Sequence, residues 1–193
     1  MSNAPAERAD AASLPDGDVV RILLQQHARI RDLFSQVKAA GGVHKQKLFD
    51  ELRGLLAVHE TAEEMVLRPT SRRVAGDSVV DARNHEEAEA TEVLARLEKM
   101  DVDTTEFDVE LAAFEKAVTE HAEREEKEEF PLVLAGCDES ERRVMGRMLR
   151  AAEAVGPTHP HTSTAGSPAA QWIAGPFASM LDHTRDAIRK AMG

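Results

Sequence analysis

The chain is short of the residues that disulfide-rich folds, radical enzymes and membrane spans require. It has one cysteine, Cys137, among 193 residues, which excludes an internal disulfide and fits a reducing compartment. It has no tyrosine, so a tyrosyl-radical mechanism is excluded. No apolar run approaches the ~18 residues of a membrane span, and the first residues lack the apolar core of a secretory signal. We therefore expect a cytoplasmic protein that does not cross a membrane.

Positive charge is also scarce. The chain has 24 Lys and Arg against 35 Asp and Glu, giving a formal net charge of -11 at pH 7, and its basic residues form no cluster. Such a chain repels nucleic acid and anionic lipid, so we expect neither as a partner. Carboxylates that bind a metal ion would account for part of this negative charge.

Strand patterns are missing as well, since aromatic residues make up 4% and no run alternates β-branched with polar residues. Apolar residues instead recur every three or four positions, which predicts helices. The four expected helices span about 18–40, 43–68, 77–100 and 105–130, the second ending at Pro69. Their short connections imply antiparallel neighbours, so the predicted fold is all-α, an up-down-up-down antiparallel four-helix bundle with additional C-terminal helices.

What the chain does contain is a doubled pattern of histidine and glutamate on the inward faces of these helices. The first half has His27 and then His59-x-x-x-Glu63, and the second has His85 and then His121-x-x-x-Glu125. Residues four apart lie on one face of a helix. Imidazole and carboxylate together are ligands for transition metals rather than for calcium or magnesium. Two such half-sites facing each other would hold two ions.

The expected helix boundaries allow a test of whether these histidines and glutamates could form one metal centre. Each of the four histidines lies eight or nine residues from the same end of the expected bundle, so all four lie at one level, ~12–14 Å from that end. Glu63 and Glu125 lie one turn closer to it. Without metal, six polar groups would be buried together with no Lys or Arg expected on those faces to pair the carboxylates. The pattern therefore predicts a metal centre rather than ordinary core histidines.

With this series of motifs in place, residues 18–134 resemble the hemerythrin-like (HHE cation-binding) family. The resemblance implies a non-haem centre of two iron ions (Fe2+/Fe3+) with a bridging oxo or hydroxo group inside the bundle. If the ligand roles of the family are assigned to the matching positions of this chain, Glu63 and Glu125 would bridge the two ions. His27 and His59 would bind one ion, and His85 and His121 the other.

Two further glutamates are candidate ligands. Oxygen-carrying hemerythrins have a fifth histidine four residues after the one on the third helix, where this chain has Glu89. As a ligand, Glu89 would stabilise Fe(III) and speed oxidation in air, whereas the alternative is a surface carboxylate. Glu60 resembles a ligand of iron-sensing members, although its side chain points ~100° away from that of His59.

The resemblance leaves three functions open. A carboxylate-rich di-iron centre that oxidises quickly suits catalase- or peroxidase-like reactions with hydrogen peroxide, or reactions with O2 or nitric oxide. The alternative is a module that senses or binds O2 or iron without turnover. A third is a helical bundle with a structural metal such as zinc, although zinc prefers closed, Cys-rich structural sites.

Outside the bundle, we expect residues 1–17 to form a disordered tail and residues 135–193 a C-terminal helical extension. Asp138, with a glutamate three residues later, predicts a helix start, and this helix should run to about residue 155. The composition of residues 156–168 predicts a linker. A last helix, about 176–192, follows Trp172 and Ile173, which we expect to pack against the bundle or against a second subunit in a homodimer.

Overall fold

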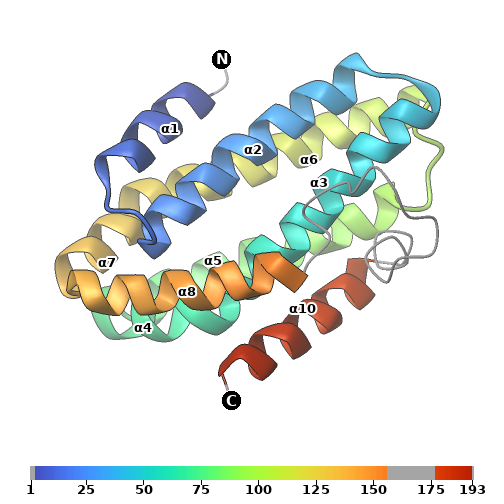
Figure 1. Ribbon diagram of the computed structural model, residues 1–193. Helices are drawn as coiled ribbons and strands as arrows, with labels where there is room; N and C mark the ends of the chain where they lie inside the picture. The colour runs from blue at the N-terminus through green and yellow to red at the C-terminus, as the bar shows by residue number, and fades with distance from the viewer. Residues whose placement is uncertain (1–2, 156–176, 193) are drawn as a thin grey trace.

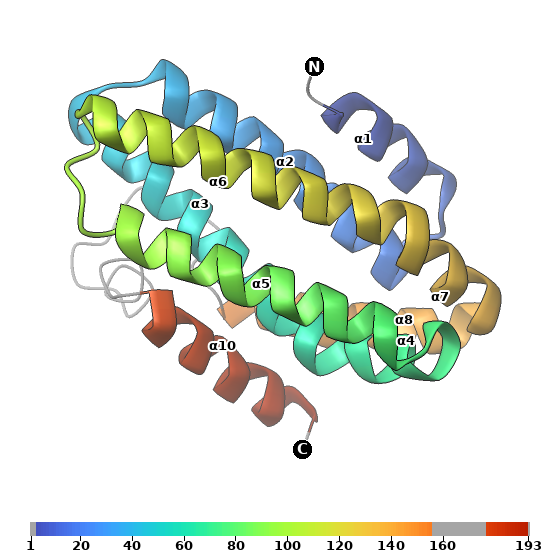
Figure 2. The same cartoon turned by 180° about the vertical axis from the view of Figure 1, so that it is seen from behind.

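The computed structural model describes residues 3–155 and 177–192, and in these ranges it is all-helical (Figure 1). Four long antiparallel helices form the bundle, as predicted: α2 (Val19–Ala39), α3 (Gly42–Ala62), α5 (Asp77–Leu97) and α6 (Thr105–Arg124). Side chains cap two of them, since Asp18 accepts from the Val20 N–H at 3.0 Å and Thr104 from the Phe107 N–H at 3.3 Å. Figure 2 shows α5 and α6 side by side on the opposite face from α8.

Two of the long helices do not end where the sequence predicts, because each passes through a π-helical turn. α3 continues through η1 (Glu63–Leu67) into α4 (Arg68–Ala75), and α6 continues through η2 (Glu125–Glu129) into α7 (Phe130–Gly136). The expectation that Pro69 halts the helix is wrong. Pro69 and Pro131 lie in the first turn of the following helix, where the missing N–H needs no partner.

The apolar core is divided into two clusters. One contains Phe34, Phe49, Phe107 and Phe114 near the end where α2 joins α3. The other contains Leu23, Val58, Leu67 and Phe130 toward the end formed by α4, α7 and α8. The predicted inward residues of α2 and α3 are buried, as expected. Buried histidines and glutamates of the same helices lie in a polar layer, which we describe below.

The N-terminal segment, expected to be a disordered tail, contains a helix, α1 (Ala4–Ser13), which packs on α2. Pro5 lies in its first turn, and the small side chains of Ala4 and Ala11 are buried against the bundle. Glu7 is also buried and forms an ion pair with Arg31 of α2. The sequence does not predict α1, because its alanines form only a weak apolar stripe.

Two C-terminal helices cover the bundle. α8 (Glu139–Val155) starts as predicted: Asp138 accepts from the Glu141 N–H at 2.9 Å, and the Glu141 carboxylate accepts from the Asp138 N–H at 2.9 Å. α10 (Phe177–Met192) packs against α3 and α8 and buries Phe177 and Met180. The expected linker 156–168, Trp172 and Ile173 lie outside the described residues. Among the described helices, none is both long and apolar enough to span a bilayer.

Candidate metal centre

Two overlapping groups of side chains have the composition of a metal site. His27, His59, Glu63 and Glu125 form the first half-site, and Glu63, Glu87, His121 and Glu125 form the second. In each group the four ligand atoms lie within 4.8 Å of one another. Glu63 and Glu125 belong to both groups, as expected for carboxylates that bridge two ions. Five of the six predicted ligands therefore come together.

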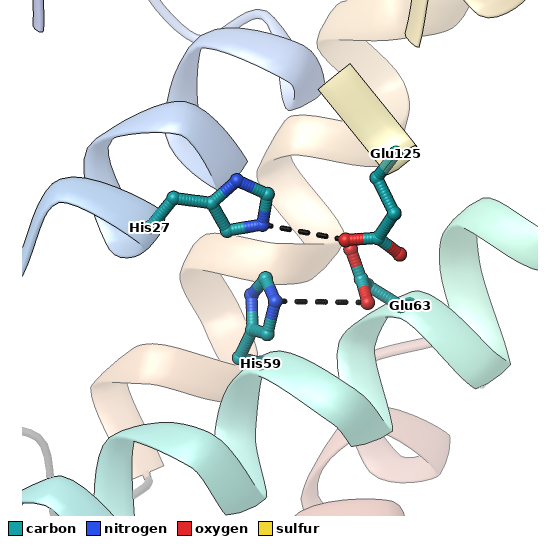
Figure 3. A group of neighbouring side chains, drawn as sticks. All are labelled: His27, His59, Glu63 and Glu125. Atoms are coloured by element: carbon teal, nitrogen blue, oxygen red, sulfur yellow. Dashed lines mark ion pairs between the residues drawn. The ribbon is translucent and has the colours of Figure 1, made fainter. Parts of the chain in front are cut away.

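The first half-site is built from three helical segments and is almost closed to solvent. In Figure 3, His27 of α2 and His59 of α3 point toward the two glutamates, which begin the π turns η1 and η2. His27 Nε2 lies 3.4 Å from Glu125 Oε2, and His59 Nε2 lies 3.6 Å from Glu63 Oε2. Each glutamate is 0% exposed. Each π turn therefore places one carboxylate in the core, a common location for this geometry in functional sites.

The three histidines of the two half-sites share one orientation, with Nδ1 held from outside and Nε2 turned inward. Nδ1 lies 2.9 Å from a carboxylate oxygen of Glu126 in His27 and 2.9 Å from Gln26 Oε1 in His59. In His121, Nδ1 lies 2.9 Å from Glu86 Oε2. Metal-bound histidines are normally held in this way, because the outer hydrogen bond fixes the tautomer and the ring plane.

The inward atoms show that these residues fit a metal ion. The buried atoms His27 Nε2, His121 Nε2, Glu63 Oε1 and Glu125 Oε2 have no hydrogen-bond partner. Buried polar atoms nearly always have a hydrogen-bond partner, so four atoms without one in a single cluster indicate a missing partner. A cation would accept lone pairs from all four atoms, and nitrogen and oxygen donors together suit a transition metal.

The second half-site differs from the prediction at one position. His85 is exposed, with its side chain 76% accessible, and its Nε2 lies 3.4 Å from Glu89 Oε1 on the same helix. The structure thus brings neither His85 nor Glu89 to the centre. Glu87 faces inward in place of His85, and it was not among the predicted ligands.

The register of α5 explains this difference. Two stripes compete on this helix. One runs through Ala82, His85 and Glu89, and the other through Val80, Glu87 and Leu94, which are seven residues, or about two turns, apart. Val80 and Leu94 are fully buried whereas Ala82 is exposed, so the second stripe faces the bundle. The predicted stripe continues through Val93 and Leu97, and Leu97 is fully buried, so apolar content alone does not separate the two stripes. In the N-terminal half of the helix, Val80 gains more from burial than Ala82 does, which favours the second stripe there.

A buried arginine corrects a second expectation, that no basic residue pairs the carboxylates. Arg68, the first residue of α4, is 3% exposed. Its guanidinium binds Glu125 Oε1 at 2.7 Å and both oxygens of Glu129 at 2.7 and 2.8 Å, and it also contacts Glu87. The sequence predicts a helix end at this position, so no inward face is expected there.

A small cavity of about 30 Å³ adjoins the centre. Its lining includes polar residues of the site, among them His59, His121 and Glu60, and apolar residues such as Leu56 and Val118. A water molecule needs roughly 10–15 Å³ of such space. The cavity therefore admits a molecule of two or three atoms. Glu60 lines this cavity and belongs to neither ligand group.

Comparison with known proteins agrees with this geometry. The Hemerythrin HHE cation binding domain matches residues 18–133, a range that contains every residue of both half-sites. The chain belongs to this family. An uncharacterized hemerythrin-like protein of Schizosaccharomyces pombe is 23% identical over 172 residues, which cover 87% of this chain and 85% of the relative. No solved structure matches the chain.

Burial and mutual charge set the protonation of this hemerythrin-like centre. Burial, helped by the charge of His27, lowers the pKa of His59 well below its ordinary value, so its ring is neutral at pH 7. Burial disfavours a charge on His121, but Glu125 outweighs this and raises its pKa well above the ordinary value. Burial and then Glu125 raise the pKa of Glu63. Burial and then Glu87 raise the pKa of Glu60 to about 8.

Helices outside the matched hemerythrin range also support the centre. The Gln26 amide oxygen accepts from His59 Nδ1 at 2.9 Å, and its amide nitrogen donates to Glu153 of α8 at 2.9 Å. On the opposite face, α1 holds Arg31, which lines the cavity, through its buried pair with Glu7. The added helices of this chain therefore reach the surroundings of the hemerythrin-like site.

Proposed function

We propose that the chain is a non-haem di-iron protein that reacts with hydrogen peroxide, O2 or nitric oxide, with peroxide disproportionation as the favoured activity. The observation that supports this proposal best is the orientation of three histidines. Their Nε2 atoms converge on two shared glutamates, while hydrogen bonds from outside hold their Nδ1 atoms. This is the arrangement expected of ligands for two ions joined by carboxylates.

The donor set favours iron over a structural zinc ion. The described ligand groups contain imidazoles and carboxylates and no thiolate, whereas structural zinc sites are usually rich in cysteine. The second half-site offers three carboxylates and one imidazole, and anionic oxygen donors stabilise the higher oxidation state. Bound iron would supply reversible electron transfer, by which two molecules of hydrogen peroxide give one O2 and two H2O.

The residues of the chain supply selection by size and exclusion of water. The cavity of about 30 Å³ beside the ligands admits peroxide, O2 or nitric oxide and excludes larger substrates. Its apolar lining residues, which include Leu56 and Val118, limit the water that enters with the substrate. Glu60 also lines the cavity and offers a carboxyl group to hydrogen-bond a small molecule there.

The test combines reconstitution with an activity assay. Purified protein, loaded anaerobically with ferrous iron and then oxidised, should contain two irons per chain and show oxo-to-iron charge-transfer bands in the near ultraviolet. It should also break down hydrogen peroxide. His121→Ala should abolish this activity, whereas His44→Ala, at an exposed histidine, should leave it unchanged. Full activity in His121→Ala, or a protein that takes up no iron, would overturn the proposal.

A second candidate function is sensing of O2 or iron without turnover, and one contact favours it. Gln26 connects the His59 ring to Glu153 of α8, so a change at the centre can alter the packing of a helix outside the matched domain. Exposure of the reduced protein to air separates the two functions. A long-lived oxygen adduct with no peroxide breakdown indicates sensing, and immediate conversion to the diferric form indicates catalysis.

A further inference from the structure

The guanidinium of Arg68 lies among the ligand atoms of the second half-site. Its Nη2 is 2.7 Å from Glu125 Oε1 and 3.4 Å from Glu63 Oε2, and it also hydrogen-bonds Glu87. These three carboxylates, with His121, are the four candidate ligands of this half-site. A nitrogen atom with positive charge therefore occupies the place where carboxylate lone pairs converge.

The other side of the guanidinium is anchored outside the half-site. Arg68 Nη1 donates to both carboxylate oxygens of Glu129, at 2.8 and 2.7 Å, and Glu129 is 0% exposed. Paired donors on a planar guanidinium hold a carboxylate firmly in one geometry. Glu129 belongs to neither group of metal ligands. It can keep the arginine paired if Nη2 leaves the half-site.

The two half-sites are therefore unequal. The first offers two imidazoles whose Nε2 atoms face the shared glutamates, and Arg68 contacts it only through those glutamates. The second shares all three of its carboxylates with Arg68, which stays charged at any physiological pH. A metal ion in the second half-site must compete with the guanidinium for the same lone pairs. Two cations held by the same carboxylates also repel each other strongly in a buried site.

We infer that Arg68 acts as a resident cation of the second half-site and makes metal loading sequential. The first ion binds at His27, His59, Glu63 and Glu125, and the second binds only when Arg68 Nη2 withdraws toward Glu129. This inference rests on the proposed metal centre. It assigns Arg68 the role of a positioning residue that sets the affinity of the second ion and pairs the carboxylates until that ion arrives.

The experiment is a calorimetric titration of the metal-free, full-length protein with ferrous iron under anaerobic conditions. The wild type should bind two ions in separate steps. Arg68→Met should tighten the second step by at least about tenfold, because the ion no longer competes with a positive charge. The first step should change less, since Arg68 contacts that half-site only through Glu63 and Glu125. Arg72→Met is the matched control, because Arg72 is on the same helix but its side chain is 43% exposed and pairs with Asp77 and Asp81.

A second variant guards against misfolding of Arg68→Met, which leaves buried carboxylates without their cation. Arg68→Lys keeps the charge but has no fork to span Glu129 and the half-site together, so the second step should tighten by an intermediate amount. Thermal unfolding gives a further readout: metal-free Arg68→Met should melt below the wild type, and iron should restore it more than it raises the wild type.

The outcomes separate the inference from the proposed function. Two equal steps in the wild type, or identical second steps in the wild type, Arg68→Met and Arg68→Lys, would overturn sequential loading and leave the metal centre standing. Absence of any iron binding by the wild type would overturn both. A tightened second step in the Arg68 variants, with Arg72→Met behaving as the wild type, supports the inference.

Discussion

The two helices that carry His-x-x-x-Glu follow the same plan up to one residue and then differ. In each, the glutamate begins a π turn, and a proline follows six residues after the glutamate. The residue before the proline is Arg68 in the first helix and Phe130 in the second. The Phe130 ring stacks on His27, with centroids 5.6 Å apart and planes at 18°. The same backbone geometry thus delivers a cation to one half-site and an apolar wall to the other.

The histidines that precede each His-x-x-x-Glu motif, His27 and His85, also differ in their surroundings. His27 is 1% exposed and held by Glu126, whereas His85 lies at the surface beside Glu89. The first half-site is therefore rich in imidazole and packed against the Phe130 ring, and the second is rich in carboxylate and paired with arginine. A sequence repeat specifies which residues can reach a centre, and the packing around each copy decides which of them do.

The largest expected effect is on stability. Phe130→Ala removes a ring that is 2% exposed and leaves a cavity beneath His27. Such a substitution costs about 3–5 kcal/mol of unfolding free energy. Chemical denaturation of the metal-free protein measures it, and Leu132→Ala, at a side chain 40% exposed, should change the stability by under about 0.5 kcal/mol. Equal effects of the two substitutions would show that Phe130 does not form an apolar wall.

A smaller effect should separate the two isolated histidines. His27→Ala removes a ligand of the first half-site and should weaken iron binding by at least about 10- to 100-fold. His85→Ala should leave it unchanged, because the His85 side chain is 76% exposed. Iron content after dialysis against a chelator measures both. If His85→Ala loses as much iron as His27→Ala, α5 must turn on metal binding to bring its other stripe inward.

The smallest expected effect tests the support of His59. Gln26→Leu keeps the buried volume but removes the amide that holds His59 Nδ1, so iron affinity should fall by about tenfold. Gln25→Leu, at the exposed neighbour, is the control. Competition with a chromophoric chelator measures both affinities. A Gln26→Leu protein with wild-type affinity would show that the outer hydrogen bond does not orient the ring.

Most of the bundle could be predicted from sequence because its signals are strong and local. The apolar spacing of α2, α3 and α6 predicted their buried faces, and five of the six proposed ligands come together. The register of α5 was harder, since two stripes compete: the stripe with His85 continues through the buried Leu97, and the other contains Val80 and Leu94. Tertiary packing of Val80 and Leu94 decides between them, and spacing alone cannot weigh that contribution.

The other two differences have a common cause. Pro69 predicted a helix end because proline disrupts regular α-helices, but a π turn shifts the hydrogen bonds so that proline begins the next helix. With the helix continued, Arg68 falls on an inward face that no spacing rule had assigned to it. The helix α1 was missed because alanine and one buried Glu7–Arg31 pair carry its packing.

The π turn at Glu63–Leu67 holds one residue more than an α-helical course would need. If the same residues were wound as a regular α-helix, each residue after the turn would lie up to ~100° further around the axis, and Arg68 would leave the inward face. The one extra residue that the wider turn accommodates therefore decides whether a positive charge reaches the shared glutamates.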